Sequence, residues 1–529
     1  MTDTPSFAPL TPLAYLQRSA RVWADQVAVR FGDDSTTYGE LLERVQTGAG
    51  ALRGAGLAVG DRVAVLLANV PAMLELQFAV PGAGGVLVPI NTRLGPGEIR
   101  FILEHSGARV LIAHDRLRAV AVDALAGMPD PPRLVVAGAP SEGEDGYDRW
   151  LERAEPVELA RPDEHALLSI NYTSGTTGRP KGVMYVHRGA YLHALGVIAE
   201  AGLSPASRYL WTLPMFHCNG WAFPWAVTAM GARHVCLEAV EPAAVWRLLG
   251  AEGITHMCCA PTVLTMLLES AEAAPLPQRV EVFVGGAPPS PALLERAGAL
   301  GFHVVHLYGL TETYGPIAVC AWRPSWDDLP TAEQARLVAR QGVGTVVSEH
   351  LRVVDDRMCD VPADGRTLGE VVMRGNNVMA GYYRDEEATA AAFAGGWLHS
   401  GDVGVMHPDG YVELRDRAKD IVITGGENVS TIEVEQALAA HPDVVEAAVI
   451  GTPDQRWGEV VKAFVVLRGE QADPAGTAEE LQRFVRGRLA GFKVPRQVVF
   501  CDELPKTATG KLQKYVLRQR DAEERRVSR

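Results

Sequence analysis

A run of small, hydroxylated and basic residues is the strongest chemical signal in this chain of 529 residues. It reads Tyr172-Thr-Ser-Gly-Thr-Thr-Gly-Arg-Pro-Lys-Gly182. Glycines let backbone N–H groups approach an anion closely, the hydroxyl groups add hydrogen-bond donors, and Lys181 adds positive charge. The run differs from a Walker loop, because it lacks the Gly-Lys-Ser/Thr ending and Pro180 precedes the lysine. It suits a triphosphate, although an ordinary turn-rich loop explains the run alone about as well.

Further short motifs along the chain carry groups suited to nucleotide or metal chemistry. They are Tyr308-Gly-Leu-Thr-Glu-Thr313, His399-Ser-Gly-Asp402, Arg415-Asp-Arg-Ala-Lys-Asp420 running into Gly425-Gly-Glu-Asn428, and Pro505-Lys-Thr-Ala-Thr-Gly-Lys511. Glu312 offers hard oxygen ligands suited to Mg²⁺, and the Asp402 carboxylate can accept hydrogen bonds from two ribose hydroxyls. Taken alone, Asp402 is best explained as a turn residue and Lys511 as a surface lysine.

Alternating strand and helix patterns surround these motifs. Strands are expected at 63–67, 85–90 and 110–113, with helices at 71–80 and 98–106 between them, and strand patterns return at 209–213, 234–237, 280–285 and 304–307. This alternation predicts parallel sheets covered by helices. The segment 344–374 is typical of antiparallel strands, with turns at its acidic and glycine-containing positions.

The chain changes character near residues 415–420. A compact pattern follows, with strands at 421–424, 444–451 and 463–467 and helices at 432–440 and 477–489. We therefore expect a domain at 1–417 and a small α+β domain at 418–529, with a hinge at 417–419.

Composition excludes several classes of protein. Hydrophobic residues make up 47% and charged residues 22%, as in a globular enzyme. The net charge of −14 disfavours binding to a nucleic-acid backbone. The most apolar stretch, 63–90, is broken by polar residues, prolines and glycines, so we expect no membrane span. Seven cysteines without a C-x-x-C pair, and no signal peptide, predict reduced thiols and a cytoplasmic location.

The motifs resemble, in order, those of the adenylate-forming superfamily, which includes acyl-CoA synthetases, luciferases and peptide-synthetase adenylation domains. The resemblance spans nearly the whole chain. It implies an α/β fold, in which a large N-terminal domain of parallel and mixed sheets with a β-barrel-like subdomain carries a small mobile α+β C-terminal domain. It also implies that a carboxylic acid is joined to the α-phosphate of ATP with release of pyrophosphate, and that Mg²⁺ offsets the repulsion between the anions.

The resemblance also implies a role for each matching residue. Lys511, Thr176 and Glu312 are expected in catalysis, with Lys511 binding carboxylate and α-phosphate oxygens as charge develops. Glu312 is expected to hold Mg²⁺ together with Thr173. ATP or AMP is expected to contact Thr173, Ser174, Gly175, Thr176, Thr177, Gly178, Lys181, Gly286, Ala287, Pro288, Tyr308, Gly309, Thr311, Asp402 and Arg417.

The segment Leu213-Pro-Met-Phe-His-Cys-Asn-Gly-Trp221 carries the most specific signal for the acid. It resembles the branch of plant acyl-activating enzymes, short- and medium-chain acyl-CoA ligases and methylmercaptopropionate–CoA ligases. The run 320–328 strengthens that placement. The expected acyl pocket contains His217, Asn219, Trp221, Gly285, Gly309 and Pro316. A tryptophan there would shorten the pocket and disfavour long chains, while aryl acids stay open. The alternative is a buried aromatic cluster without ligand contact.

Family members alternate between two conformations, and the resemblance places this motion too. The hinge position is Lys419, and the Gly425-Gly426 loop is expected to line a tunnel for the pantetheine arm of CoA. The expected substrates are ATP, CoA and a small carboxylic acid. A homodimer is compatible with the resemblance.

The final acceptor stays open at this stage. The leading hypothesis is an acid–CoA ligase. A second hypothesis keeps the adenylation but passes the activated group to another nucleophile, by forming an amide, loading a carrier protein or activating nitrite to make a diazo group. A third, a non-catalytic nucleotide-binding relative, is disfavoured by the presence of Glu312 and Lys511.

Overall fold

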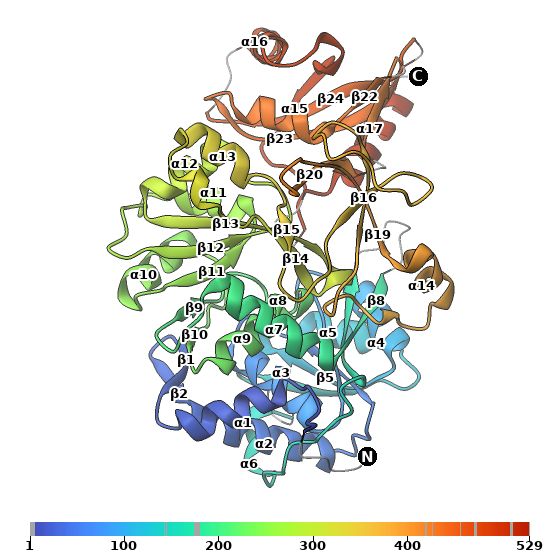
Figure 1. The fold of residues 1–529 in the computed structure, drawn as a ribbon. Helices are drawn as coiled ribbons and strands as arrows, with labels where there is room; N and C mark the ends of the chain where they lie inside the picture. The colour runs from blue at the N-terminus through green and yellow to red at the C-terminus, as the bar shows by residue number, and fades with distance from the viewer. Residues whose placement is uncertain are drawn as a thin grey trace.

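The computed structural model describes residues 6–141, 143, 145–173, 180–417, 420–425, 427–454, 456–469, 473–507 and 512–527. Its strands form four sheets with helices packed around them (Figure 1). The C-terminal unit, the described residues of 420–527, is drawn in orange and red above the rest of the molecule.

The first sheet has seven strands and contains the two strands that flank the predicted phosphate loop. They are β3 (Arg62–Leu66), β4 (Val86–Pro89), β5 (Ala108–His114), β6 (Arg133–Ala137), β7 (Leu167–Thr173), β8 (Lys181–Val186) and β18 (Gly381–Tyr382). Their order is β18-β8-β7-β4-β3-β5-β6. The β18–β8 and β8–β7 pairs are antiparallel, and the other pairs are parallel. Val63 and Val65 join one hydrophobic cluster, whereas Ala64 and Leu66 join another, so both faces of β3 are covered.

The second sheet has nine strands and carries the Tyr308 motif. They are β1 (Val27–Phe31), β2 (Asp34–Thr37), β9 (Arg208–Leu210), β10 (Arg233–Val235), β11 (His256–Cys259), β12 (Val280–Val284), β13 (Phe302–Leu310), β14 (Gly315–Val319) and β15 (Val343–Gly344). The order is β15-β14-β13-β12-β11-β9-β10-β1-β2. Since β11, β12 and β13 run parallel, their carboxyl ends meet at one edge. That edge therefore brings Gly285 and Tyr308 together.

Helices cover these two sheets. They are α1 (Leu13–Val22), α2 (Tyr38–Gly54), α3 (Pro71–Gly82), α4 (Pro96–Ser106), α5 (Arg118–Leu125), α6 (Tyr147–Glu152), α7 (His187–Ala201), α8 (Cys218–Trp221), α9 (Phe223–Ala229), α10 (Pro242–Ala251), α11 (Pro261–Leu268), α12 (Pro291–Ala299) and α13 (Thr331–Val338). None of the helices in the described part of the chain is long and apolar enough to cross a membrane.

The third sheet is antiparallel and leads to the predicted hinge. Its strands β16 (Arg352–Val354), β17 (Gly369–Met373), β19 (Leu398–Met406) and β20 (Val412–Arg417) follow one another in that order, beside α14 (Glu386–Ala392). A backbone bridge between Gly342 and Val412 connects β20 to the end of the second sheet. Antiparallel strands are thus present where the sequence predicts them.

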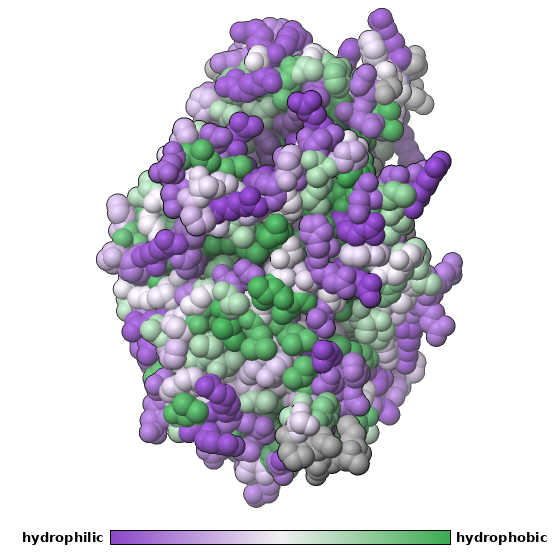
Figure 2. Space-filling model, viewed as in Figure 1, coloured by the Kyte–Doolittle hydropathy of each residue, from purple (hydrophilic) through white to green (hydrophobic). Residues whose placement is uncertain are grey.

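The C-terminal unit has its own sheet and hydrophobic cluster. It contains β21 (Val422–Thr424), β22 (Glu427–Val429), β23 (Val444–Asp454), β24 (Gly458–Leu467) and β25 (Gln497–Phe500), with α15 (Thr431–Ala439), α16 (Pro474–Arg486) and α17 (Lys514–Val527). α16 starts three residues earlier than predicted, because Pro474 occupies its first turn and the Asp473 side chain accepts a hydrogen bond from the Gly476 N–H. Figure 2 shows mainly polar residues over this unit on the viewed face, and apolar residues gathered over the middle of the molecule.

Candidate active site

The predicted phosphate loop connects β7 to β8. Thr173 at the end of β7 pairs in register with Lys181 at the start of β8, so the two ends of the loop are held together. The Lys181 ammonium lies 4.7 Å from the centre of the Tyr382 ring, a cation–π contact. The predicted loop contacts Ser174, Gly175, Thr176, Thr177 and Gly178 lie outside the described residues.

Glu312 lies in a short 3-10 turn, Thr311–Thr313, directly after β13. The Tyr382 hydroxyl donates to Glu312 Oε1 at 2.8 Å, and the Thr311 carbonyl accepts from the Tyr185 hydroxyl at 2.6 Å. Burial, followed by the Glu312 carboxylate, raises the pKa of Tyr382, so this phenol acts as a donor. Tyr382 therefore contacts both Lys181, the cation at the end of the phosphate loop, and Glu312, the predicted Mg²⁺ ligand.

Tyr308 and Asp402 are buried and form a cluster with the partly exposed Arg417. The Tyr308 hydroxyl donates to Asp402 Oδ2 at 2.7 Å, and Arg417 Nε lies 3.0 Å from Asp402 Oδ1. The Ser400 hydroxyl accepts from the Asp402 N–H. Burial, and then Asp402, raises the pKa of Tyr308 well above its usual value, which keeps the phenol protonated. Burial opposes the charge on Arg417, but Asp402 and Tyr308 outweigh it and the pKa of Arg417 is raised.

Three sequence motifs meet in this cluster although they are far apart in the chain. Tyr308 comes from β13, while Asp402 and Arg417 face each other across the β19–β20 pair. In this cluster the Asp402 carboxylate pairs with the Arg417 guanidinium, and the Tyr308 hydroxyl is an additional donor to the carboxylate. It is suited to bind a ribose, because Asp402 is a double acceptor close to an aromatic ring.

Glycines leave room where the backbone must approach a ligand or another strand. Gly286 has φ +89° and open space where a Cβ would be, and the neighbouring Ala287 is exposed beside the half-buried Pro288. At Gly309, a Cβ would collide with the Gly315 carbonyl oxygen of the adjacent strand. These positions flank Tyr308, as expected for walls around an adenine ring.

The predicted acyl segment contains an unusual left-handed turn. Positive φ values between 40° and 62° occur at five consecutive residues, Cys218, Asn219, Gly220, Trp221 and Ala222. This conformation costs roughly 1–2 kcal/mol for each residue other than glycine. The turn is fully buried, so the surrounding structure must impose it.

The turn directs the Trp221 indole between two strands of the second sheet. A Cβ atom added to Gly285 would lie 2.8 Å from Cη2 of the indole, and one added to Gly315 would lie 2.5 Å from its Cδ1. Pro316, the next residue, is also buried. Trp221 itself is 6% exposed, and its ring packs against Gly285 and Gly315. Gly309 in turn packs against Gly315 and Pro316 of the adjacent strand. The structure thus brings four of the six predicted pocket residues together.

The other two predicted pocket residues have different surroundings. His217 Nε2 lies 3.6 Å from the Cys218 sulfur and is only partly buried. Asn219 is fully buried, and its carboxamide is hydrogen-bonded to Ser169, Asn171 and Gln77.

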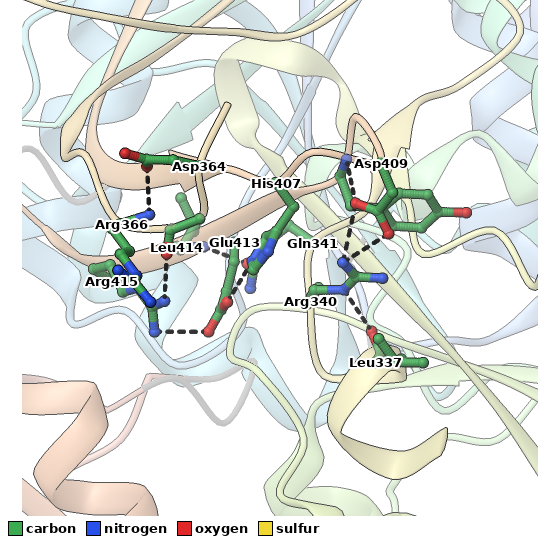
Figure 3. A network of polar contacts seen from close by, with 12 residues as sticks. Leu337, Arg340, Gln341, Asp364, Arg366, His407, Asp409, Glu413, Leu414 and Arg415 are labelled. Atoms are coloured by element: carbon green, nitrogen blue, oxygen red, sulfur yellow. Dashed lines mark hydrogen bonds and ion pairs between the residues drawn. The ribbon is translucent and has the colours of Figure 1, made fainter. Parts of the chain in front are cut away.

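An ionic network supports β20, the strand that leads to the predicted hinge (Figure 3). Arg340 is 5% exposed and lies 3.0 Å from Asp409, in the turn before β20. Glu413 on β20 contacts both His407 and Arg415, at 2.7 and 2.8 Å. Burial raises the pKa of Glu413, but His407 and Arg415 outweigh it and lower the pKa overall. The network fixes β20 to the N-terminal part of the molecule.

Contacts also cross the predicted hinge. The Asp416 carboxylate accepts from the N–H and the hydroxyl of Thr431 at the start of α15, and is 2% exposed. Gly425 has φ +60° and packs against the Trp457 ring. The predicted hinge residue Lys419 and the predicted tunnel residue Gly426 lie outside the described residues.

A cleft of about 710 Å³ lies between the C-terminal unit and the first and second sheets. One wall follows the carboxyl ends of β3, β9 and β11 and includes Asn69, Leu213, Phe216 and Cys259; the other includes Val445, Glu446, Lys506 and Thr507. Arg468 of the C-terminal unit lies 2.8 Å from Glu269 at its edge. Thr507 lies on the cleft wall, and Lys511, four residues later, lies outside the described residues.

The sequence did not indicate Tyr382 or Tyr185. Each is an ordinary aromatic residue in a strand, and its contact at the site depends on a partner far away in the chain. Tyr382, for instance, reaches Glu312 because β18 is added to the edge of β8. No local spacing could have predicted that contact.

Comparison with known proteins identifies the family of the chain. The model of the AMP-binding enzyme family matches residues 16–383, and that of the AMP-binding enzyme C-terminal domain matches 433–511. The chain is 44% identical to acetate–CoA ligase CCL3 of Humulus lupulus, over 97% of this chain and 95% of the relative. Some plant relatives are named peroxisomal.

Solved structures agree as well. The anthranilate CoA ligase AuaEII in complex with anthranoyl-AMP superposes with a TM-score of 0.87 at 28% identity, over 98% of both chains. Amide bond synthetase McbA of Marinactinospora thermotolerans gives 0.82 at 29% identity, over 96% of this chain and 99% of its own. This chain therefore belongs to the AMP-binding enzyme family.

Proposed function

We propose that the protein is an ATP-dependent ligase that adenylates a short-chain carboxylic acid and then transfers the acyl group to CoA. The observation that carries this proposal is the Tyr308–Asp402–Arg417 cluster beside Glu312, at the carboxyl edge of the second sheet. Relatives that match over their full length and are named acetate–CoA and butyrate–CoA ligases support the choice of reaction and of acid.

In the first half-reaction, a carboxylate oxygen bonds to the α-phosphorus of ATP and pyrophosphate leaves. Asp402 accepts from the ribose hydroxyls, and the Tyr308 ring lies against the adenine. Lys181 and Lys511 offset the charge of the phosphates and the carboxylate. Arg417 orients Asp402 through their 3.0 Å ion pair. In the second half-reaction, the CoA sulfur attacks the acyl carbon and AMP leaves.

The residues present fit the Mg²⁺ that this reaction requires. Magnesium in nucleotide sites is held by one or two carboxylates, substrate phosphates and water. Glu312 supplies one carboxylate with its Oε1 hydrogen-bonded to Tyr382, and Thr173 supplies a hydroxyl at the loop entrance. Bound there, the ion would neutralise phosphate charge.

The chain would divide at 417/418, and the C-terminal unit would turn about Lys419 between the half-reactions. Thr507, four residues before Lys511 in the chain, lies on the cleft wall, which supports a role for Lys511 in the first half-reaction. After the turn, Gly425 and Gly426 would replace Lys511 and line the path of the pantetheine arm. Breaking the contacts of Asp416 with Thr431 and of Arg468 with Glu269 would accompany this motion.

The size of the acid follows from Trp221. Its indole lies against Gly285 and Gly315, and we infer that it shortens the acyl pocket and favours short acids. A second candidate function, amide formation from the same adenylate, is favoured by the likeness to the amide bond synthetase. The cytoplasmic location and a homodimer remain predictions.

A panel of acids from acetate to octanoate, with benzoate, would test this function. Pyrophosphate release would be measured with and without CoA, and with an amine as the alternative acceptor. We expect the fastest release with an acid of two to five carbons in the presence of CoA, together with the acyl-CoA product. Release that depends on the amine and yields no thioester would favour the second function.

A further inference from the structure

A small network of buried amides supports the turn that carries Trp221. Asn219 Oδ1 accepts from the Ser169 hydroxyl at 2.9 Å and from Asn171 Nδ2 at 2.5 Å. Asn219 Nδ2 donates to Gln77 Oε1 at 2.8 Å, and the Asn219 N–H donates to Asn171 Oδ1 at 3.2 Å. All four residues are at most 2% exposed. Two protein donors occupy the Asn219 carboxamide oxygen, and one N–H of its NH₂ group donates to Gln77. Since Asn219 is also 0% exposed, its side chain is placed to hold the turn.

The network joins two parts of the candidate site to a buried helix. Asn219 belongs to the left-handed turn, two residues before Trp221. Ser169 and Asn171 belong to β7, which ends at Thr173 where the phosphate loop begins. Gln77 belongs to α3, whose neighbours are buried apolar residues. The turn and the strand to the phosphate loop are therefore held in one register by the same carboxamide.

The hydrogen bonds also explain how a strained turn persists. Asparagine tolerates a left-handed backbone better than most residues, but Cys218, Trp221 and Ala222 do not share that advantage. Since the reciprocal bonds between Asn219 and Asn171 involve both the backbone and the side chain, rotation of the turn would break them together. The indole position follows from that constraint.

We propose that Asn219 is a positioning residue for acid specificity: it holds Trp221 against Gly285 and Gly315, and so sets the length of the acyl pocket without touching the acid. The inference rests on the proposed function. It replaces the sequence-based expectation that Asn219 lines the pocket itself. Gln77 acts in the same way from outside the site.

The experiment measures one ratio of specificity constants for the wild-type protein and for each full-length variant. This ratio is kcat/KM for hexanoate over kcat/KM for propionate, measured by pyrophosphate release at saturating ATP and CoA. In Asn219→Ala we expect it to rise about tenfold, because one to several methylenes in an apolar pocket change kcat/KM by 10-fold or more. Gln77→Met, which keeps the volume but removes the acceptor, should raise it less.

Two further variants separate positioning from general destabilisation. Tyr38→Phe removes a buried hydrogen bond, to the Ala232 carbonyl at 2.5 Å, that does not involve the acyl segment 213–221. It should lower the melting temperature and leave the ratio unchanged. Trp221→Ala should raise the ratio, and adding Asn219→Ala to it should raise it no further, because Asn219 acts through the indole.

The outcomes distinguish this inference from the proposed function. If Trp221→Ala raises the ratio but neither Asn219→Ala nor Gln77→Met does, the positioning role is wrong. An equal effect of Asn219→Ala with and without Trp221 would also overturn it. If Asn219→Ala does not fold, Gln77→Met decides alone. If the wild-type protein forms no acyl-CoA from any acid, the proposed function fails first.

Discussion

Replacing Asp402 by asparagine should weaken ATP binding without unfolding the protein. In Asp402→Asn, the carboxamide oxygen can still accept from Arg417. In the wild type, Asp402 Oδ2 accepts from the Tyr308 hydroxyl at 2.7 Å; in the variant, the NH₂ group can donate to that hydroxyl instead. What is lost is the charge, and with it one acceptor for a ribose hydroxyl. A hydrogen bond to a charged group contributes about 1.5–3 kcal/mol. The KM for ATP should therefore rise roughly 10- to 150-fold.

The assay is pyrophosphate release as ATP is varied at a saturating acid concentration. Asp521→Asn is a matched control, because Asp521 is also 3% exposed and lies 2.7 Å from the Thr452 hydroxyl and 2.8 Å from Lys462, but in the C-terminal unit. It should lower stability and leave the KM for ATP unchanged. A KM for ATP within twofold of wild type in a folded Asp402→Asn protein would refute the ribose assignment.

Three other predictions follow from the same structure. Glu312→Gln should shift the Mg²⁺ concentration for half-maximal rate upward, because an amide is a poorer ligand for a hard cation; an unchanged Mg²⁺ titration would remove Glu312 from the metal site. Lys511→Ala should lower the rate of adenylate formation about 10²–10³-fold in a folded protein while a supplied acyl-adenylate is still converted to thioester, and loss of both steps would contradict a role in the first half-reaction alone. Burial lowers the pKa of His187, His193 and His306 to about 4, so the unfolded chain binds more protons below pH 6.5 and stability should fall from there toward pH 4 by about 1.4 kcal/mol per pH unit for each histidine. Melting temperatures from pH 7 to 5 would show it, and His193→Leu should flatten the slope; an unaltered slope would exclude that histidine.

The sequence predicted most of the fold because periodicity and motif order are local properties. The strands at β3, β12 and β23 and the helices at α3 and α15 appear within a few residues of their predicted bounds. The motifs of Tyr308, Asp402 and Arg417 were recognised separately, and the structure adds that their side chains contact one another. Residue type indicated the chemistry, whereas the pairing of β19 with β20 decided the geometry.

The part that could not be predicted depends on long-range packing. Trp221 was expected at the acyl pocket, but its contact with two glycines requires five consecutive left-handed residues that no propensity favours. Asn219 was assigned to the pocket because it lies in the same short segment as Trp221. Its partners are 48 to 142 positions away in the chain, which spacing alone cannot reveal.

The most direct test of the central claim follows an oxygen atom. With butyrate labelled in both carboxylate oxygens with ¹⁸O, adenylation forms a bond between one of these oxygens and the α-phosphorus. Attack by the CoA sulfur then breaks the bond between that oxygen and the acyl carbon. We expect one ¹⁸O in each AMP and one in each butyryl-CoA, detected by mass spectrometry. AMP without ¹⁸O, or labelled AMP without any thioester, would contradict the account.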